Sequence, residues 1–268
     1  MRFAGWMLLM VVLMVASAVP CWSASLQGLV QELETSVKYE AQAEDWSQRR
    51  ADWLQQVGAA TSVGQLAPLV QVLETSVKFE AQTDNWRERR TGWMQELAAA
   101  TTAAQLCNLV IELETSVKFE AQTENWPTRR DGWLGEVRAV ADAASQALSQ
   151  AAQLLLQFES SVKYESQTDE WRAQRDAWIS SVTAASSVAE LAQQMLVFEQ
   201  SIKFESQNAD WASQREAWIQ KVSAATSIPE LAAQLAVLEV SVKYAAQTEA
   251  WRSQRDAWVG AVTGLITQ

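Results

Sequence analysis

One motif occurs six times in this chain, and it constrains the fold more than any other feature. It reads approximately L-E-x-S-V-K-[FY]-E-[AS]-Q-x-x-x-W-x-x-x-R-x-x-W and recurs between Leu33 and Trp258. The copies are spaced 40 residues apart, except for a step of 45 between the third and the fourth. A fixed period of this size indicates a repeat array, in which each unit buries its apolar face against its neighbours.

The repeats have a helical pattern with two different faces. Nine glycines and four prolines in 268 residues leave few helix breakers. In the second copy, apolar residues from Leu66 to Val77 recur at helical spacing, and Trp86 and Trp93 form another stripe. A continuous helix would put these stripes on opposite sides, so we predict a turn between Gln82 and Trp86.

We therefore predict an all-α protein of six tandem helix-turn-helix repeats that form an open α-solenoid-like array. Three junctions between repeats resemble capping boxes, which start a helix: Ser62-x-x-Gln65, Ser187-x-x-Glu190 and Ser227-x-x-Glu230. The alternatives are a bundle of long two-faced helices and a closed α/α toroid. A short strand over 76–82 is a further alternative, because apolar and polar residues alternate there.

The N-terminus has the features of a secretory signal. Residues 1–18 contain Arg2, an apolar run and the small-x-small sequence Ala16-Ser17-Ala18, which is typical of a cleavage site. We predict a cleaved signal over 1–18, a short segment over 19–25, and no integral membrane segment after cleavage. The mature protein is then exported to the periplasm, the cell surface or the medium.

The array divides into two sets of three repeats, over 26–145 and 146–268. The seam near 138–153 carries five extra residues and lacks the Ser-x-x-Glu signal. Repeats one to three have Arg-Arg before the second tryptophan, whereas repeats four to six have Gln-Arg. These differences predict a bend or a longer helix at the seam of one continuous array.

Charge and cysteine content exclude some classes of partner. The formal net charge is −11, so we expect the chain to repel nucleic acids and anionic lipid surfaces. Two cysteines, Cys21 and Cys107, are too few to hold a repeat array together, and the sequence leaves open whether they pair.

The W-x-x-x-R-x-x-W unit places an arginine one helical turn from each tryptophan. We interpret these residues as a buried structural ladder, and as an alternative they form a binding surface for sugars or another planar ligand. The residues are Trp46, Arg50, Trp53, Trp86, Arg90, Trp93, Trp126, Arg130, Trp133, Trp171, Arg175, Trp178, Trp211, Arg215, Trp218, Trp251, Arg255 and Trp258.

The arginines need buried carboxylate partners. One glutamate of each of the first five repeats falls on the apolar stripe of the predicted first helix, where an unpaired carboxylate is costly. We predict that each pairs with the arginine of the next repeat: Glu40, Glu80, Glu120, Glu165 and Glu205. The sixth repeat has Ala245 at this position. Glu34 and Lys38, and their counterparts, have the spacing of surface pairs along a helix.

The sequence does not indicate an enzyme. The chain has no histidine, no glycine-rich phosphate loop and no singular cluster of acids, and we predict no catalytic residue, metal or cofactor. We expect an exported, non-catalytic scaffold or protein-interaction and self-assembly surface. The alternative is a glycan- or cell-wall-binding protein that uses the tryptophans and arginines. A lipid-surface array is disfavoured by the negative charge.

Overall fold

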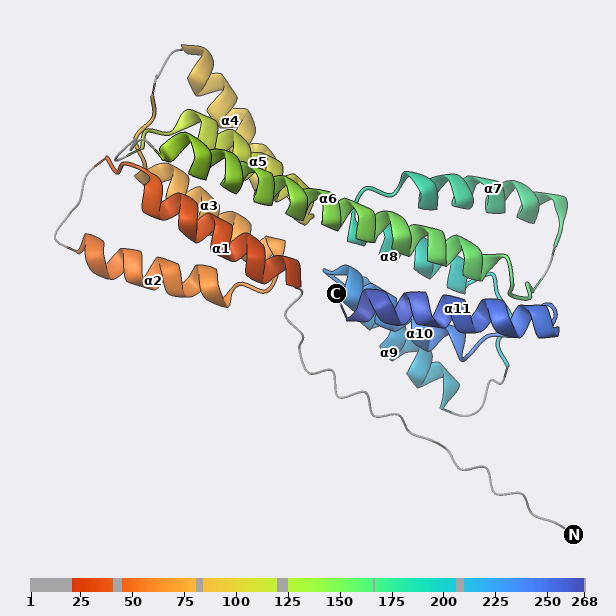
Figure 1. The fold of residues 1–268 in the computed structure, drawn as a ribbon. Helices are drawn as coiled ribbons and strands as arrows, with labels where there is room; N and C mark the ends of the chain where they lie inside the picture. The colour runs from red at the N-terminus through yellow and green to blue at the C-terminus, as the bar shows by residue number, and fades with distance from the viewer. Residues whose placement is uncertain are drawn as a thin grey trace, which may run out of the picture.

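The computed structural model is all-helical over the part of the chain that it describes, and its helices follow one another in pairs (Figure 1). The described residues are 21–40, 45–80, 84–119, 125–165, 167–205 and 210–267. Their helices are α1 (Cys21–Ser36), α2 (Trp46–Ala59), α3 (Val63–Ser76), α4 (Asp84–Ala99), α5 (Ala103–Ser116), α6 (Trp126–Glu159), α7 (Asp169–Ala184), α8 (Val188–Glu199), α9 (Trp211–Ser223), α10 (Ile228–Glu239) and α11 (Glu249–Ile266). The predicted array of helix pairs is confirmed. The predicted signal over 1–18 lies outside the described residues.

Each repeat consists of a first helix, a short extended segment and a second helix. In the second repeat, α3 ends at Ser76, and the backbone is extended at Val77 and bridged at Phe79. The alternation of polar and apolar residues over 76–82 thus reflects a real extended stretch, although it forms only isolated bridges in the described residues. The predicted turn from Gln82 lies partly outside those residues, and α4 begins at Asp84.

The extended segments close each set of three repeats into a ring. Tyr39 bridges Val77, Phe79 bridges Val117, and Phe119 returns to bridge Val37. Three backbone hydrogen bonds of 2.7 Å join the same segments. The backbone N–H of Lys78 donates to the carbonyl of Lys38, that of Lys118 to Lys78, and that of Lys38 to Lys118. Lys163, Lys203 and Lys243 form the equivalent ring in the second set, with distances of 2.8 Å. Periodicity alone did not reveal this pseudo-threefold closure.

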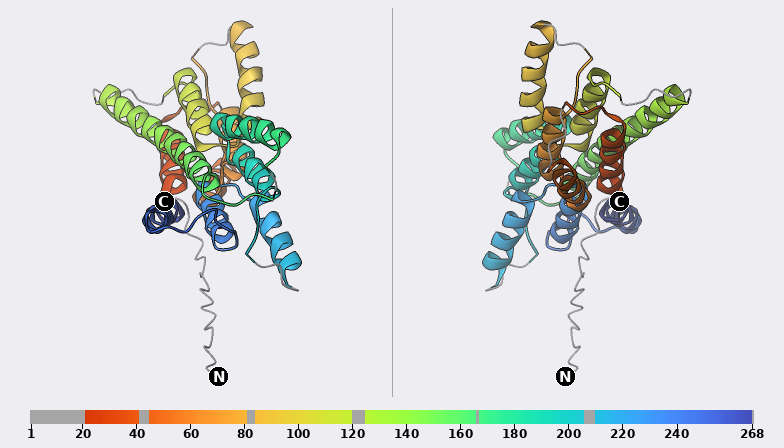
Figure 2. Two further views of the ribbon diagram at one scale, coloured as in Figure 1. Left: turned by 90° about the vertical axis from the view of Figure 1, so that its right-hand side faces the viewer. Right: turned by 90° about the vertical axis from the view of Figure 1, so that its left-hand side faces the viewer.

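Within each ring the first helices form the centre. In the first set, α1, α3 and α5 contact one another, and each second helix contacts the first helix of its own repeat and that of the next. The N-terminal part of α6 completes the circle by packing against both α5 and α1. In the end views of Figure 2, α4 and this part of α6 project outward from the centre.

The two sets share α6, which is 34 residues long and runs from one unit into the other (Figure 1). The apolar core divides along it, with Ala141 in the first core and Ala151 in the second. Four other junctions between repeats break the helix, as between α2 and α3, but the seam does not. The longer helix predicted at the seam is therefore present. Described residues of repeats one and six do not pack together, so the six repeats do not form a toroid.

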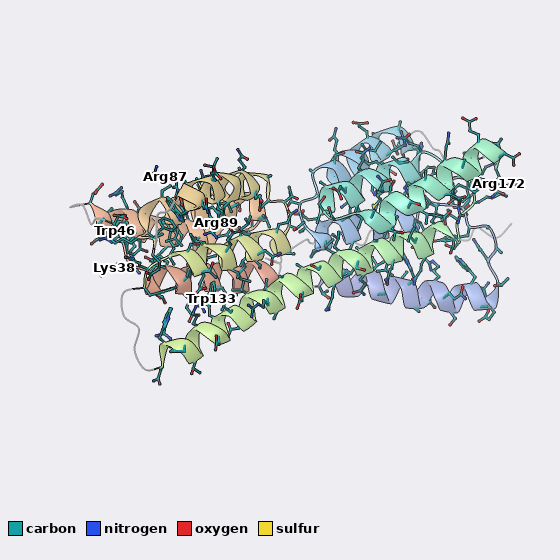
Figure 3. The ribbon with its side chains drawn as sticks, turned by 90° about the horizontal axis from the view of Figure 1, so that it is seen from above. Lys38, Trp46, Arg87, Arg89, Trp133 and Arg172 are labelled. Atoms are coloured by element: carbon teal, nitrogen blue, oxygen red, sulfur yellow. The ribbon has the colours of Figure 1, made fainter. Side chains whose placement is uncertain are left out.

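The units meet at the ends that carry the inter-repeat loops. Helix starts from both units, among them Val63, Ala103, Val188 and Ile228, line one largely apolar pocket beside the middle of α6. The lysine rings consequently lie at the two far ends of the molecule, and Figure 3 shows Lys38 at one end and Arg172 near the other.

Of the three capping boxes predicted from the sequence, the structure contains some and not others. The Ser227 hydroxyl accepts from the backbone N–H of Glu230, and the Glu230 side chain completes a capping box. Ser187 accepts from the N–H of Glu190, whereas Ser62 makes no side-chain cap. Thr102 and Gln105 form a further capping box, which the three predicted boxes did not include.

Candidate functional site

The second tryptophan of each motif is a structural residue. Trp53 is 7% exposed, and its indole Nε1 donates a 2.9 Å hydrogen bond to the carbonyl oxygen of Leu69 in the next repeat. Trp93, Trp178 and Trp218 do the same to the repeats that follow them. Each indole therefore buries a large apolar surface while its polar N–H remains satisfied.

The second tryptophan of the third repeat in each unit closes the ring. Trp133 donates to Leu29 at 2.9 Å and Trp258 donates to Leu154 at 2.8 Å, each 104 residues earlier in the chain. Every repeat in a unit is thus bonded to the next one by the same contact. The interpretation of these tryptophans as a buried ladder fits this geometry.

The motif arginine forms a buried ion pair within its own repeat. Arg50 donates from Nε and from one terminal nitrogen to the two carboxylate oxygens of Glu34, at 2.5 and 2.6 Å. Glu34 is 2% exposed, so the two-pronged contact satisfies a carboxylate that water does not reach. The equivalent pairs are Arg90–Glu74, Arg130–Glu114, Arg175–Glu159, Arg215–Glu199 and Arg255–Glu239.

These pairs show that the predicted arginine partners were wrong. Glu40, Glu80, Glu165 and Glu205 are exposed, and Glu120 lies outside the described residues. The prediction extended the helical stripe through the motif, but α1 ends at Ser36, and beyond it the extended backbone points alternate residues to opposite faces. For the same reason Glu34 and Lys38 do not form a pair along a helix.

A tyrosine completes the carboxylate site in half of the repeats. The Tyr39 hydroxyl donates to Glu34 Oε1 at 2.5 Å, and Tyr244 makes the equivalent contact with Glu239. Burial, and then the hydrogen bond to the carboxylate, raise the pKa of Tyr39 well above its usual value. The hydrogen bond to Glu34 raises the pKa of Arg50. Phenylalanine occupies this position in repeats two, three and five.

The first tryptophan of each motif is only half-buried. Trp46 packs on Tyr39 with a centroid distance of 4.3 Å, and Trp86 packs on Phe79 at 4.8 Å. The Arg90 guanidinium lies 5.7 Å from the Trp86 ring centroid, within cation–π range. The same half-buried position recurs at Trp126, Trp171, Trp211 and Trp251.

These half-buried rings line shallow grooves between repeats. One groove, of about 310 Å³, lies between α4 and α5 and includes Trp86, Arg89 and Glu112. An equivalent groove of about 280 Å³ between α6 and α1 includes Trp126, Arg129 and Glu32. A third, of about 950 Å³, lies between α11 and α6 with Trp251, Gln254 and Gln157 at the same positions.

In the other three repeats, the position equivalent to Glu32, Glu112 and Gln157 carries an exposed valine. Val72, Val197 and Val237 are the counterparts of Glu32, Glu112 and Gln157 in the repeat, and they are 51, 43 and 49% exposed. On the opposite wall, the residue before the motif arginine is arginine in the first unit and glutamine in the second. The six repeats therefore share the half-buried tryptophan and differ in the polar or apolar residue across from it.

No cluster of three or more metal-ligating side chains occurs among the described residues. No helix in this part of the chain is long and apolar enough to cross a membrane. Cys107 is completely buried, and burial raises the pKa of its thiol to about 12.

Comparison with known proteins connects the second unit to one family. The model of a domain of unknown function (DUF8799) matches residues 145–212 and 194–252. The matches overlap, and together they cover the second unit from the seam in α6 to the start of α11. No curated protein and no solved structure matches the chain.

Proposed function

We propose that this protein is an exported, non-catalytic scaffold that binds protein partners, or further copies of itself, through the repeated grooves. The observation that carries this proposal is the half-buried tryptophan of every repeat. It lines a groove in three repeats, and in the other three an exposed valine occupies the equivalent of the groove's far wall. Protein interfaces characteristically combine an aromatic residue with an apolar surface inside a polar rim.

The polar groups of the motif support a scaffold rather than an enzyme. Glu34 and Arg50 satisfy each other inside the fold, and the indole of Trp53 is bonded to a backbone carbonyl. Catalysis needs polar groups that converge on a reacting atom, and these groups converge on one another instead. The use of the same pairs in all six repeats is typical of structural residues.

The arrangement of the two units supports a bridging role. The units share α6 and direct their far ends away from each other (Figure 1). A partner bound to a groove of one unit is therefore held at a defined distance from a partner on the other. Several equivalent grooves on one chain also allow weak contacts to combine into strong binding.

The experiment compares two sets of groove variants of the mature chain. In the first, the valines at 72, 197 and 237 are replaced by lysine, and in the matched control the same change is made at Gln55, Gln95 and Gln220, which are exposed and line none of the three grooves. Sedimentation velocity over a range of concentrations, and co-purification from the native envelope fraction, measure assembly. We expect the valine variant to lose association and the control to keep most of it. Equal behaviour of both variants and the wild type would refute the proposal.

A glycan-binding function is the second candidate, and one observation favours it. The half-buried rings of Trp46 and its counterparts lie beside arginine or glutamine side chains, a combination that can stack on a sugar and bind its hydroxyls. Co-sedimentation with cell-wall polysaccharide tests this candidate. A blue shift of tryptophan emission on binding, reduced by Arg89→Gln, would support it over the protein-binding proposal.

A further inference from the structure

Six of the seven lysines in this chain lie in the two backbone rings. In each ring, an antiparallel bridge joins the residue before one lysine to the residue after another lysine. The two lysines of each such pair therefore lie directly opposite each other. Residues in that position have neighbouring Cβ atoms on one face of the sheet. Like charges placed opposite one another destabilise a sheet, so each ring needs compensating negative charge.

The three lysine side chains of a ring lie on its outer face. Val162, Ile202 and Val242 precede the lysines of the second ring and are at most 3% exposed, so they occupy the core side. Because successive residues of an extended segment point to opposite faces, the lysines face away from the core. They are gathered at the end of the unit, around its pseudo-threefold axis.

In the second ring, a glutamate of the preceding repeat lies next to two of the three lysines along the chain of backbone contacts, and one of these glutamates forms an ion pair. Glu165 donates its backbone N–H to Ser201, and its carboxylate lies 3.5 Å from Lys203. Glu205 has the same backbone contact with Ser241 beside Lys243. The third position is occupied by Ala245, whose N–H donates to Ser161 beside Lys163. This ring thus has three lysines and two glutamates.

Exposure separates Lys163 from the other five lysines. Lys163 is exposed, whereas its counterparts in both rings are half-buried. The difference coincides with Ala245, whose side chain is shorter than the glutamate that the other five repeats carry at this position. The first ring has Glu40 and Glu80 beside Lys78 and Lys118 and also has a glutamate at position 120.

We propose that the Lys163 end of the second unit binds an oxyanion, a phosphate or sulfate group, in the place that the Glu165 carboxylate takes beside Lys203. The oxyanion contacts Lys163 and compensates the excess positive charge of the ring. Ala245 leaves the space that the anion enters. The group is either a free ion or a substituent on a polymer, since both present the same oxygens to the lysines. Binding weakens as the salt concentration rises, because the site is exposed to solvent.

The test uses the full mature chain and calorimetric titration with inorganic phosphate and with sulfate at constant ionic strength. The main variant is Ala245→Glu, which introduces the residue that the five other repeats carry. We expect it to weaken binding about two- to fivefold, the range that an opposite-charge pair across strands provides. Lys163→Gln should weaken binding at least as much. Lys78→Gln, the matched control in the first ring, should leave it unchanged.

A second variant makes the result independent of any loss of folding. Glu80→Ala opens the equivalent position in the first ring and should add a second anion site, while circular dichroism verifies that each variant keeps its helices. Dextran sulfate and uncharged dextran then distinguish a polymer-borne group from a free ion. Absence of binding to the wild type, or equal binding by wild type and Ala245→Glu, would overturn the proposal.

Discussion

The indole Nε1 of Trp133 donates a 2.9 Å hydrogen bond to the carbonyl oxygen of Leu29, which lies 104 residues earlier in the chain. Trp53 and Trp93 make the same contact with the repeats that follow them. The last tryptophan of the first unit is therefore equivalent to the two before it, as closure into a ring requires. In a linear stack of six repeats, Trp133 would instead bond to the fourth repeat, which follows it in the chain.

Closure predicts that replacing any of these three tryptophans by phenylalanine has the same effect. Each change removes the indole hydrogen bond, while the accepting helical carbonyl keeps its backbone partner, so the lost hydrogen bond costs about 0.5–1.5 kcal/mol of unfolding free energy. Chemical denaturation of Trp53→Phe, Trp93→Phe and Trp133→Phe measures the three losses. A clearly smaller loss for the Trp133 variant would indicate that the ring opens at that point in solution.

The Arg90–Glu74 pair predicts a strong and non-additive effect of mutation. Glu74 is 1% exposed, so Arg90→Ala leaves a buried carboxylate without its partner and should destabilise the protein by about 3–5 kcal/mol. The double variant Glu74→Leu/Arg90→Met should lose much less, because both charges leave together. A double-mutant cycle from denaturant unfolding measures the coupling. Glu80→Gln is the control, and its exposed position predicts a change within about 0.5 kcal/mol.

The three tyrosines predict a loss of stability at alkaline pH. The pKa values of Tyr39, Tyr164 and Tyr244 are raised in the folded state by burial and by hydrogen bonds to their glutamates. An unfolded tyrosine loses its proton near pH 10, so the folded state binds more protons above that pH. Their stabilising contribution is therefore complete below about pH 10 and is lost as the pH rises further.

Phenylalanine at these three positions tests the alkaline effect, and the chain already uses phenylalanine in the other repeats. At neutral pH each Tyr→Phe change should cost about 0.5–1.5 kcal/mol for the lost hydrogen bond. Thermal unfolding between pH 8 and 11 should then show a flatter decline for the triple variant than for the wild type. Parallel declines would assign the alkaline loss to other groups.

The helices and their order could be predicted from the sequence because apolar spacing directly reports which face of a helix is buried. The partner of the arginine could not, because the assignment depended on where the first helix ends. α3 ends at Ser76, which places Glu74 on the helix and Glu80 on the extended segment beyond it. A shift from helical to extended geometry within a few residues reverses which of two glutamates faces the core.

The closure of each unit was also beyond the reach of periodicity. A 40-residue period predicts contacts between one repeat and the next along the chain. The contact between Trp133 and Leu29 joins the third repeat back to the first, so the period does not predict it. The grooves were missed for a related reason, since each is formed by two repeats. The valine at position 72 was a usable signal, because it is an apolar residue in place of the glutamates at 32 and 112.

The Cys107 thiol should be unreactive in the folded protein. Its side chain is completely buried, and its pKa is raised to about 12, so little thiolate forms at neutral pH. Iodoacetamide at pH 8 should label this residue only after addition of denaturant, as measured by peptide mass spectrometry. Rapid labelling under native conditions would show that α5 separates readily from its neighbours.

The continuity of α6 predicts that a proline at its middle separates the two units without unfolding either. Ser145 lies between the two cores and is exposed, and its equivalents in other repeats lie at or near natural helix breaks. Ser145→Pro removes a helical hydrogen bond and should cost about 3 kcal/mol or more locally. Near-ultraviolet circular dichroism should keep the signal of the packed tryptophans, while small-angle scattering shows a wider range of dimensions. Ser145→Ala is the control and should resemble the wild type. Loss of the tryptophan signal in the proline variant would mean that each core depends on an unbroken α6.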